Sequence, residues 1–160
     1  MTLTKTALYR ASLLTDNLGV RLCLAAVLVM PSALVFLAPL FGLFGEVGEV
    51  GEGLLAFGPA RDGGWGSTLA ALALCIGFAA AWMRILFPGG GLPRRPGLRL
   101  FVLIALSLGT VTLAGALALR AMTRTPDDGA GWLLLAALAA HAFLLAGTLG
   151  QPRPERLNRI

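Results

Sequence analysis

The chain has 160 residues, of which 57% are hydrophobic and only 13% are charged, and its formal net charge is +5. A soluble globular domain is usually about half apolar and about a quarter charged, so this composition excludes an ordinary soluble domain and favours a surface solvated by lipid. The apolar residues form long runs that leave no room for a separate soluble domain. The basic balance is better explained by the position of the charges relative to a membrane than by nucleic-acid binding.

The N-terminal segment, residues 1–19, is amphipathic. Its apolar residues recur at helical spacing, whereas Lys5, Arg10 and Asp16 lie elsewhere on the helical wheel. A helix of this kind that carries Lys and Arg can lie in the headgroup region of a membrane. The alternative is a solvated helical turn that leads into the first membrane span, and the pattern leaves both interpretations open.

The first predicted span covers residues 20–44 and begins with a continuous apolar run. Pro31 and Pro39 each remove an intrahelical hydrogen bond, so the sequence predicts a helix that is kinked or broken near the middle of the membrane. A secretory signal peptide is the competing interpretation, because basic residues precede the run. The run is longer than the usual hydrophobic region of about 7–15 residues and no A-x-A cleavage site follows it, so we predict a retained helix.

A loop follows the first span and opens with the repeat GEVGEVGEG, in which Glu46, Glu49 and Glu52 recur at a fixed spacing. Three carboxylates can in principle bind a hard cation such as calcium. The spacing matches no EF-hand pattern, and the intervening glycines disfavour a preformed cage. We therefore predict a mobile acidic loop and no metal site.

The second predicted span covers residues 67–87, with Trp65 at its start and Trp82 near its end, as expected for the aromatic belts of a membrane. A Gly- and Pro-rich connection at 88–96 cannot continue the helix. The third and fourth spans are predicted at 98–122 and 130–149, separated by the turn signal TPDDG, and a basic tail occupies 150–160. The predicted fold is all-α: one membrane domain, residues 1–160, built as a four-helix bundle with short loops.

Orientation follows from the distribution of Lys and Arg between the loops. One side carries only Arg61, Arg120 and Arg124, together with most of the acidic residues. The other side carries Lys5, Arg10, Arg21, Arg84, Arg94, Arg95, Arg99, Arg153, Arg156 and Arg159. This bias predicts that both termini are cytoplasmic, and we expect a multi-pass protein of the bacterial inner membrane.

His141 is the one ionisable residue predicted near the centre of the bilayer, where such groups often serve function. A proton relay, or haem ligation shared with a partner subunit, is possible in principle. The structural alternative, which we favour, is a neutral imidazole that hydrogen-bonds across helices, since Ser107 is predicted at nearly the same depth on the third span and Thr110 one turn further out. We predict no cofactor and no metal bound by this chain alone.

Small residues recur every four positions on the predicted helices, which suggests close helix packing. The candidate packing stripes are Ala73, Gly77 and Ala81 on the second span, and Ala142, Ala146 and Gly150 on the fourth. Cys23 and Cys75 are predicted at depths too different for a disulfide.

Two arginines fall close to the predicted ends of spans. Arg84 lies near one end of the second span and Arg120 near the opposite surface, on the third span. Both are expected to anchor their helices by extending the guanidinium to the interface.

No catalytic constellation is visible, because no serine is accompanied by a plausible base and acid and no carboxylate pair lies within a span. The leading hypothesis is therefore a non-catalytic accessory, assembly or regulatory subunit, which packs against other integral membrane subunits or itself within the lipid bilayer. The alternative is a small oligomeric transporter or channel with a polar path near His141. A third hypothesis is an electron-transfer subunit in which His141 and a partner share a haem.

Overall fold

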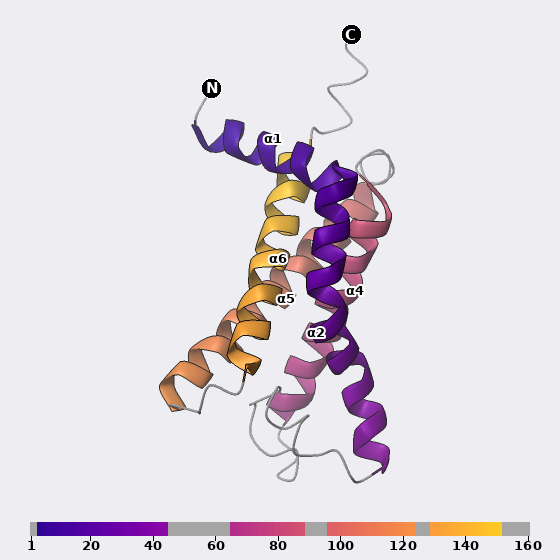
Figure 1. Cartoon of the computed structure of the whole chain (residues 1–160), viewed down its shortest axis with the longest axis vertical. Helices are drawn as coiled ribbons and strands as arrows, with labels where there is room; N and C mark the ends of the chain where they lie inside the picture. Colours follow the sequence, from indigo (N-terminus) through magenta and orange to yellow (C-terminus); the bar gives the residue numbers. More distant parts are fainter. Residues whose placement is uncertain (1–2, 45–64, 89–95, 124–128, 152–160) are drawn as a thin grey trace.

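The computed structural model describes residues 3–44, 65–88, 96–123 and 129–151 (Figure 1). These residues form five helices, which confirms the all-helical fold. In chain order they are α1 (Leu3–Asp16), α2 (Leu18–Phe44), α4 (Trp65–Leu86), α5 (Pro96–Thr123) and α6 (Ala130–Gly150). The acidic repeat and residues 152–160 of the basic tail lie outside the described residues.

Three helices are long and apolar enough to cross a membrane, through the segments Leu18–Leu37, Gly97–Met122 and Gly131–Gly150. A shorter apolar stretch, Leu72–Leu86, lies in α4. Within a bilayer the backbone must satisfy its own hydrogen bonds, and a long apolar helix does so along its whole length. The structure therefore supports a membrane protein with three candidate spans.

The bundle core lies where α4 packs along α5, α5 along α6, and α2 against α4 and α6. Its largest apolar side chains include Leu28, Phe78, Leu106 and Leu144, all of which are fully buried. Many other large apolar side chains on α2, α5 and α6 are exposed on the outside of the bundle. An apolar exterior around a packed interior is the arrangement that a lipid solvent favours.

Pro31 does not break the first long helix. Helix α2 is continuous through this residue, although its axis bends in the lower half (Figure 1). The neighbouring Ser32 hydroxyl donates to the carbonyl of Val29 at 3.1 Å and accepts a hydrogen bond from Trp82 Nε1, also at 3.1 Å. Of the two outcomes predicted for this helix, a kink or a break, the structure shows no break but a continuous helix with a bent axis, and Ser32 beside the proline bonds to Trp82 of α4.

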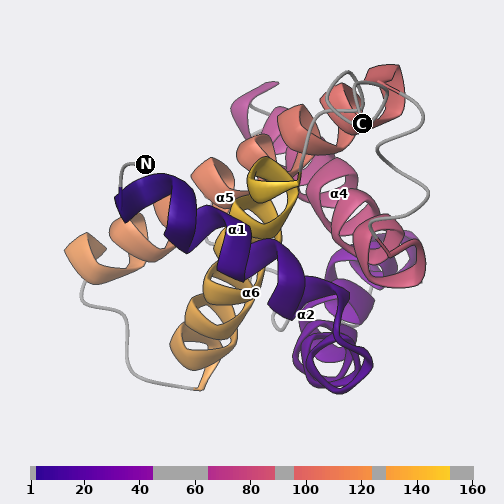
Figure 2. The same ribbon diagram turned by 90° about the horizontal axis from the view of Figure 1, so that it is seen from above.

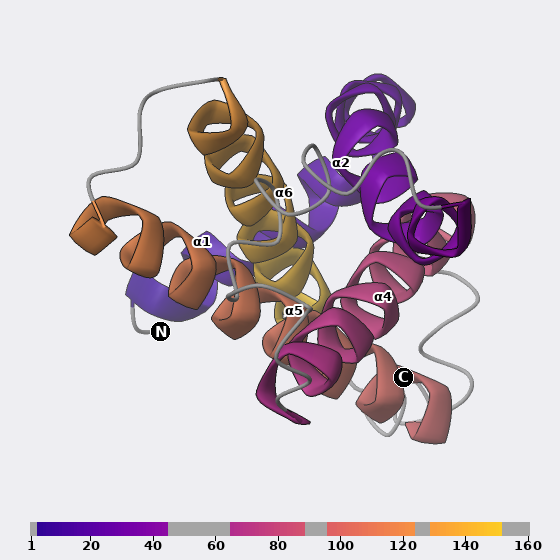
Figure 3. The same ribbon diagram turned by 90° about the horizontal axis from the view of Figure 1, so that it is seen from below.

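Helix α1 is a separate element that lies across one end of the bundle, over the C-terminal end of α6 (Figures 1 and 2). It ends at Asp16, and Asn17 Oδ1 accepts a hydrogen bond from Gly19 N at 2.9 Å at the start of α2. This side-chain acceptor is typical of a helix N-cap. The view from the other end of the bundle shows α1 behind the remaining helices (Figure 3). The N-terminal segment is therefore not a simple continuation of the first span.

Candidate functional site at the junction of the N-terminal helix and the bundle

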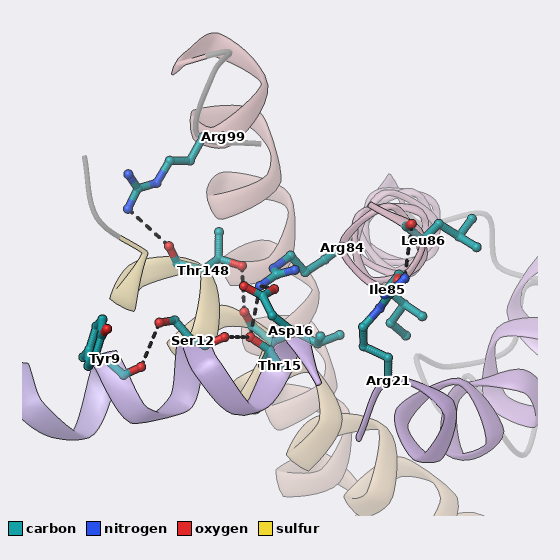
Figure 4. A network of polar contacts seen from close by, with 11 residues as sticks. Tyr9, Ser12, Thr15, Asp16, Arg21, Arg84, Ile85, Leu86, Arg99 and Thr148 are labelled. Carbon is teal, nitrogen blue, oxygen red and sulfur yellow. Dashed lines mark hydrogen bonds and ion pairs between the residues drawn. The ribbon is translucent and has the colours of Figure 1, made fainter. Parts of the chain in front are cut away.

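The best-defined polar cluster surrounds Arg84, at the end of α4 that α1 covers (Figure 4). Arg84 has 0% of its side chain exposed, and its Nη2 donates to Thr15 Oγ1 at 3.0 Å and to Asp16 Oδ1 at 2.7 Å. The prediction that Arg84 extends to the interface is therefore wrong. The reason is that α1 folds back over this end of the bundle and supplies the counterion.

The ion pair is unequal in its burial, because 37% of the Asp16 side chain is exposed while Arg84 is fully covered. Within the described part of the chain, Arg84 Nε and Nη1 are buried and make no hydrogen bond. Removing a cation from water is costly unless it is paired, so Arg84 depends on the carboxylate that α1 brings to it. The pair thus couples the position of α1 to the integrity of α4.

Two further arginines at this end of the bundle bind the C-terminal carbonyls of helices. Arg21 Nε donates to the carbonyl of Ile85 at 2.6 Å, and its Nη2 to that of Leu86 at 3.2 Å. Arg99 Nη2 donates to the carbonyls of Thr148 and Gln151 at 3.2 and 2.8 Å. Cations are favoured at helix C-termini, where carbonyls lack helical partners. Arg21 and Arg99, which the sequence analysis used only to predict the orientation in the membrane, therefore also join α2 to α4 and α5 to α6.

Arg120, at the other end of α5, is also buried, with 8% exposed, and it takes part in an interaction. It does not extend outward as predicted. Burial against other helices, rather than anchoring at an interface, therefore accounts for both Arg84 and Arg120.

Helix α1 reaches the bundle through two glycines on α6. A β-carbon at Gly150 would collide with the backbone carbonyl of Leu8, and one at Gly147 would collide with the Thr15 side chain. Ser12 and Thr15 are buried on the same face of α1, and each hydroxyl donates to a carbonyl of its own helix. Satisfying these hydroxyls locally lets a partly polar helix face pack closely.

Replacing Gly150 with valine is expected to detach α1 from α6, because the colliding atom belongs to the Leu8 backbone and cannot rotate away. Overpacking usually costs about 1–3 kcal/mol. A loss of this size in the contact between α1 and α6 lets α1 open more often, so its amides should exchange faster. Hydrogen exchange followed by mass spectrometry measures this directly. Gly97→Val is the control, since a β-carbon at Gly97 meets nothing within 4 Å. Unchanged protection of α1 in Gly150→Val would contradict the docked arrangement.

His141 lies in the interior of the bundle with 0% exposed. Its Nδ1 is 2.9 Å from the carbonyl of Ala137, one turn earlier on the same helix, and its ring meets Phe78 edge-on with centroids 4.8 Å apart. Nε2 is buried without a hydrogen bond of ordinary geometry among the described residues, although the backbone of Gly77 lies near the ring. The imidazole is thus held by its own helix and by α4.

The predicted partners of His141 lie elsewhere. Ser107 is exposed on the outside of α5, and the Thr110 hydroxyl donates to the carbonyl of Leu106 at 2.7 Å. The structure therefore does not bring His141, Ser107 and Thr110 together as one polar site. Gly109 occupies the position on α5 that faces the imidazole, where its added β-carbon would lie 3.2 Å from His141 Cδ2.

The packing stripe predicted on α4 is buried along its whole length, as Ala73, Gly77 and Ala81 all face the bundle. A β-carbon at Gly77 would lie 2.6 Å from Gly109 Cα, so α4 and α5 cross with their backbones nearly in contact. Such crossings at small residues are characteristic of membrane helices.

The stripe predicted on α6 is divided between environments. Ala142 is exposed, Ala146 is half-buried, and Gly150 lies against α1. Gly147, which was not singled out in the sequence, makes the other close contact with α1. The contact with α1 therefore includes Gly150 of the predicted stripe and, in place of Ala146, its neighbour Gly147, which lies about 100° further around the helix.

Within the described ranges no group of three or more His, Cys, Asp and Glu side chains could hold a metal ion. Cys23 is exposed and Cys75 half-buried, and both are free thiols. The carboxylates of Glu46, Glu49 and Glu52 fall outside the described residues.

Comparison with protein-family models, with curated proteins and with solved structures finds no match for this chain. Its class therefore rests on its own architecture, which is a helical bundle with three apolar candidate spans and a crosswise N-terminal helix held by a buried ion pair. These features support a membrane protein.

Proposed function

We propose that this chain is a non-catalytic accessory, assembly or regulatory subunit of a larger membrane complex, and that it acts by packing helices against a partner. The observation that carries the proposal is an exposed face on α5 where small residues recur at helical spacing. This face, which we call the α5 outer face, consists of Ser107, Val111, Ala114, Gly115 and Ala118.

The α5 outer face has the properties that close helix association requires. A β-carbon at Gly115 would meet nothing within 4 Å, and Val111 is 70% exposed. Between membrane helices there is no hydrophobic drive, so association depends on close backbone approach and on polar groups such as Ser107. A partner helix against this face could approach as closely as α4 approaches α5 at Gly77.

The interior of the bundle gives less support to the alternative functions. Ser32 and Thr110, which would line a transport path, already take part in hydrogen bonds. His141 is enclosed by α4 and α5, so a haem shared with a partner could reach it only if these helices separated. A path inside one copy of the chain, or a shared haem, would therefore need a different arrangement of the same helices, whereas a path between copies would not.

We further propose that the chain spans the bacterial inner membrane four times, with both termini in the cytoplasm. Helix α4 has 22 residues, which at 1.5 Å per residue extend about 33 Å, enough for a hydrocarbon core of about 30 Å. The side chains of Arg21, Arg84 and Arg99 all lie at the end of the bundle that α1 crosses. A cluster of arginines at one end supports a cytoplasmic location for that end.

The test is recovery of the partner from native membranes with tagged wild type and with Gly115→Leu. We expect wild type to retain a stoichiometric second polypeptide and Gly115→Leu to lose it, because leucine would hold the partner helix away. The fold should be unaffected, since the space beside Gly115 is open. Ala139→Leu, on the exposed side of α6, is the matched control and should retain the partner.

Equal recovery with both variants would exclude the α5 outer face as the interface. A wild-type protein that purifies only with copies of itself would favour the oligomeric transporter instead, and flux measurements on His141→Ala would then follow.

A further inference from the structure

A groove of about 600 Å3 lies in the angle between α1 and α6, where α1 crosses the bundle. Five of its lining residues come from α1 and one from α6. They are Thr6, Ala7, Arg10, Ala11, Leu14 and Phe143.

The α6 side of the groove, Phe143, lies closer to the middle of α6 than the contacts that α6 makes with α1. Helix α1 contacts α6 at Gly147 and Gly150, in the last turns of the apolar segment Gly131–Gly150. Phe143 lies one turn earlier, so it is about 6 Å further from that end of the helix. If α6 crosses the bilayer, α1 lies at the interface and the groove beneath it is open to the acyl chains.

The lining separates into an apolar part and a single cation. Ala7, Leu14 and Phe143 offer hydrocarbon surface, whereas Arg10 is exposed and makes no hydrogen bond or ion pair among the residues that the structure describes. The nearest carboxylate in sequence, Asp16, is engaged by Arg84. Arg10 therefore keeps its charge available for an anion at the mouth of an apolar groove.

We propose that this groove binds an anionic phospholipid, with an acyl chain along α1 and Phe143 and the headgroup phosphate paired with Arg10. An arginine fork matches the geometry of a phosphate, and basic residues at the cytoplasmic surface favour anionic lipids. This inference rests on the proposed membrane orientation, but the groove shares no lining residue with the α5 outer face, so it is independent of the proposed partner.

Native mass spectrometry of the detergent-purified full chain tests the proposal, with dioleoyl phosphatidylglycerol and dioleoyl phosphatidylcholine as probes that share their acyl chains. We expect wild type to prefer phosphatidylglycerol. Arg10→Gln should weaken phosphatidylglycerol binding about five-fold, the usual effect of one basic residue near anionic lipid. It should leave phosphatidylcholine binding unchanged, and Arg10→Lys should restore most of the preference.

Two further variants of α1 separate a groove from general attraction to a basic protein. Lys5→Gln removes an equal charge from an exposed position on α1 that does not line the groove, and it should not change binding. Ala7→Trp fills the groove from an exposed position and should weaken both lipids. Equal losses in Arg10→Gln and Lys5→Gln, or full binding by Ala7→Trp, would overturn the proposal. Either outcome leaves the partner test with Gly115→Leu unaffected.

Discussion

Replacing Gly77 with leucine is expected to prevent α4 and α5 from packing, and so to leave the protein without its folded bundle. A β-carbon at Gly77 would lie 2.6 Å from Gly109 Cα and 3.3 Å from Gly109 N, and both atoms belong to the backbone. No rotamer change can relieve this contact. Overpacking by a few atoms costs about 1–3 kcal/mol, so alanine should already destabilise the bundle and leucine should exceed what it tolerates. Unfolding in mixed detergent micelles, followed by circular dichroism, measures the effect.

The matched control for Gly77→Leu is Gly115→Leu, which makes the same change where a β-carbon meets nothing within 4 Å. We expect this variant to unfold like wild type. A Gly77→Leu protein as stable as Gly115→Leu would show that α4 and α5 do not cross at Gly109. It would also remove the environment described for His141, because Gly109 lies beside both Gly77 and the imidazole ring.

Replacing Asp16 with alanine is expected to destabilise the protein by about 2 kcal/mol, since it leaves the buried Arg84 guanidinium without its carboxylate. Breaking a fully buried pair costs about 3–5 kcal/mol, and the lower value reflects the 37% exposure of Asp16, which admits water. The loss should appear as faster hydrogen exchange in α1 and a lower midpoint of unfolding.

Arg84→Met is the informative comparison for Asp16→Ala. This variant removes the buried cation itself. In the wild type the Nε and Nη1 atoms of Arg84 have no partner among the described residues, so Arg84→Met should destabilise the protein less than Asp16→Ala does. Combining Asp16→Ala with Arg84→Met should recover part of the stability lost in Asp16→Ala alone. If Arg84→Met were more harmful than Asp16→Ala, the arginine would contribute through contacts other than this ion pair.

Hydropathy and breaker residues predicted much of the secondary structure. The long helices begin and end within a few residues of the predicted spans, because a run of apolar residues can bury its backbone only as a helix. Glycine and proline between the runs then mark the connections. The prolines of the first span predicted a kink or a break, and the structure decides between them, since α2 continues through Pro31 with a bent axis.

The side chains that contact His141 could not be predicted from the sequence. Depth along a helix follows from counting residues, and on that basis Ser107 and Thr110 were plausible partners. Contact also depends on the direction in which a side chain leaves the helix. Ser107 and Gly109 are two positions apart on α5, so their directions differ by about 200°. Gly109 faces the imidazole, and Ser107 therefore points away from it. The sequence predicted that Gly77 belongs to a packing stripe, but its pairing with Gly109 follows only from the way that α4 and α5 cross.

The sequence by itself determined the class of protein, since lipid solvation demands long apolar helices and the residue order displays them directly. It also determined that basic residues gather at one end of the bundle. Only the tertiary structure decided what those residues do, because α1 folds back across α6 at Gly147 and Gly150 and buries Arg84 against Asp16. Whether a charge reaches water depends on which element covers it. That depends on contacts between segments far apart in the chain, which a one-dimensional pattern does not record.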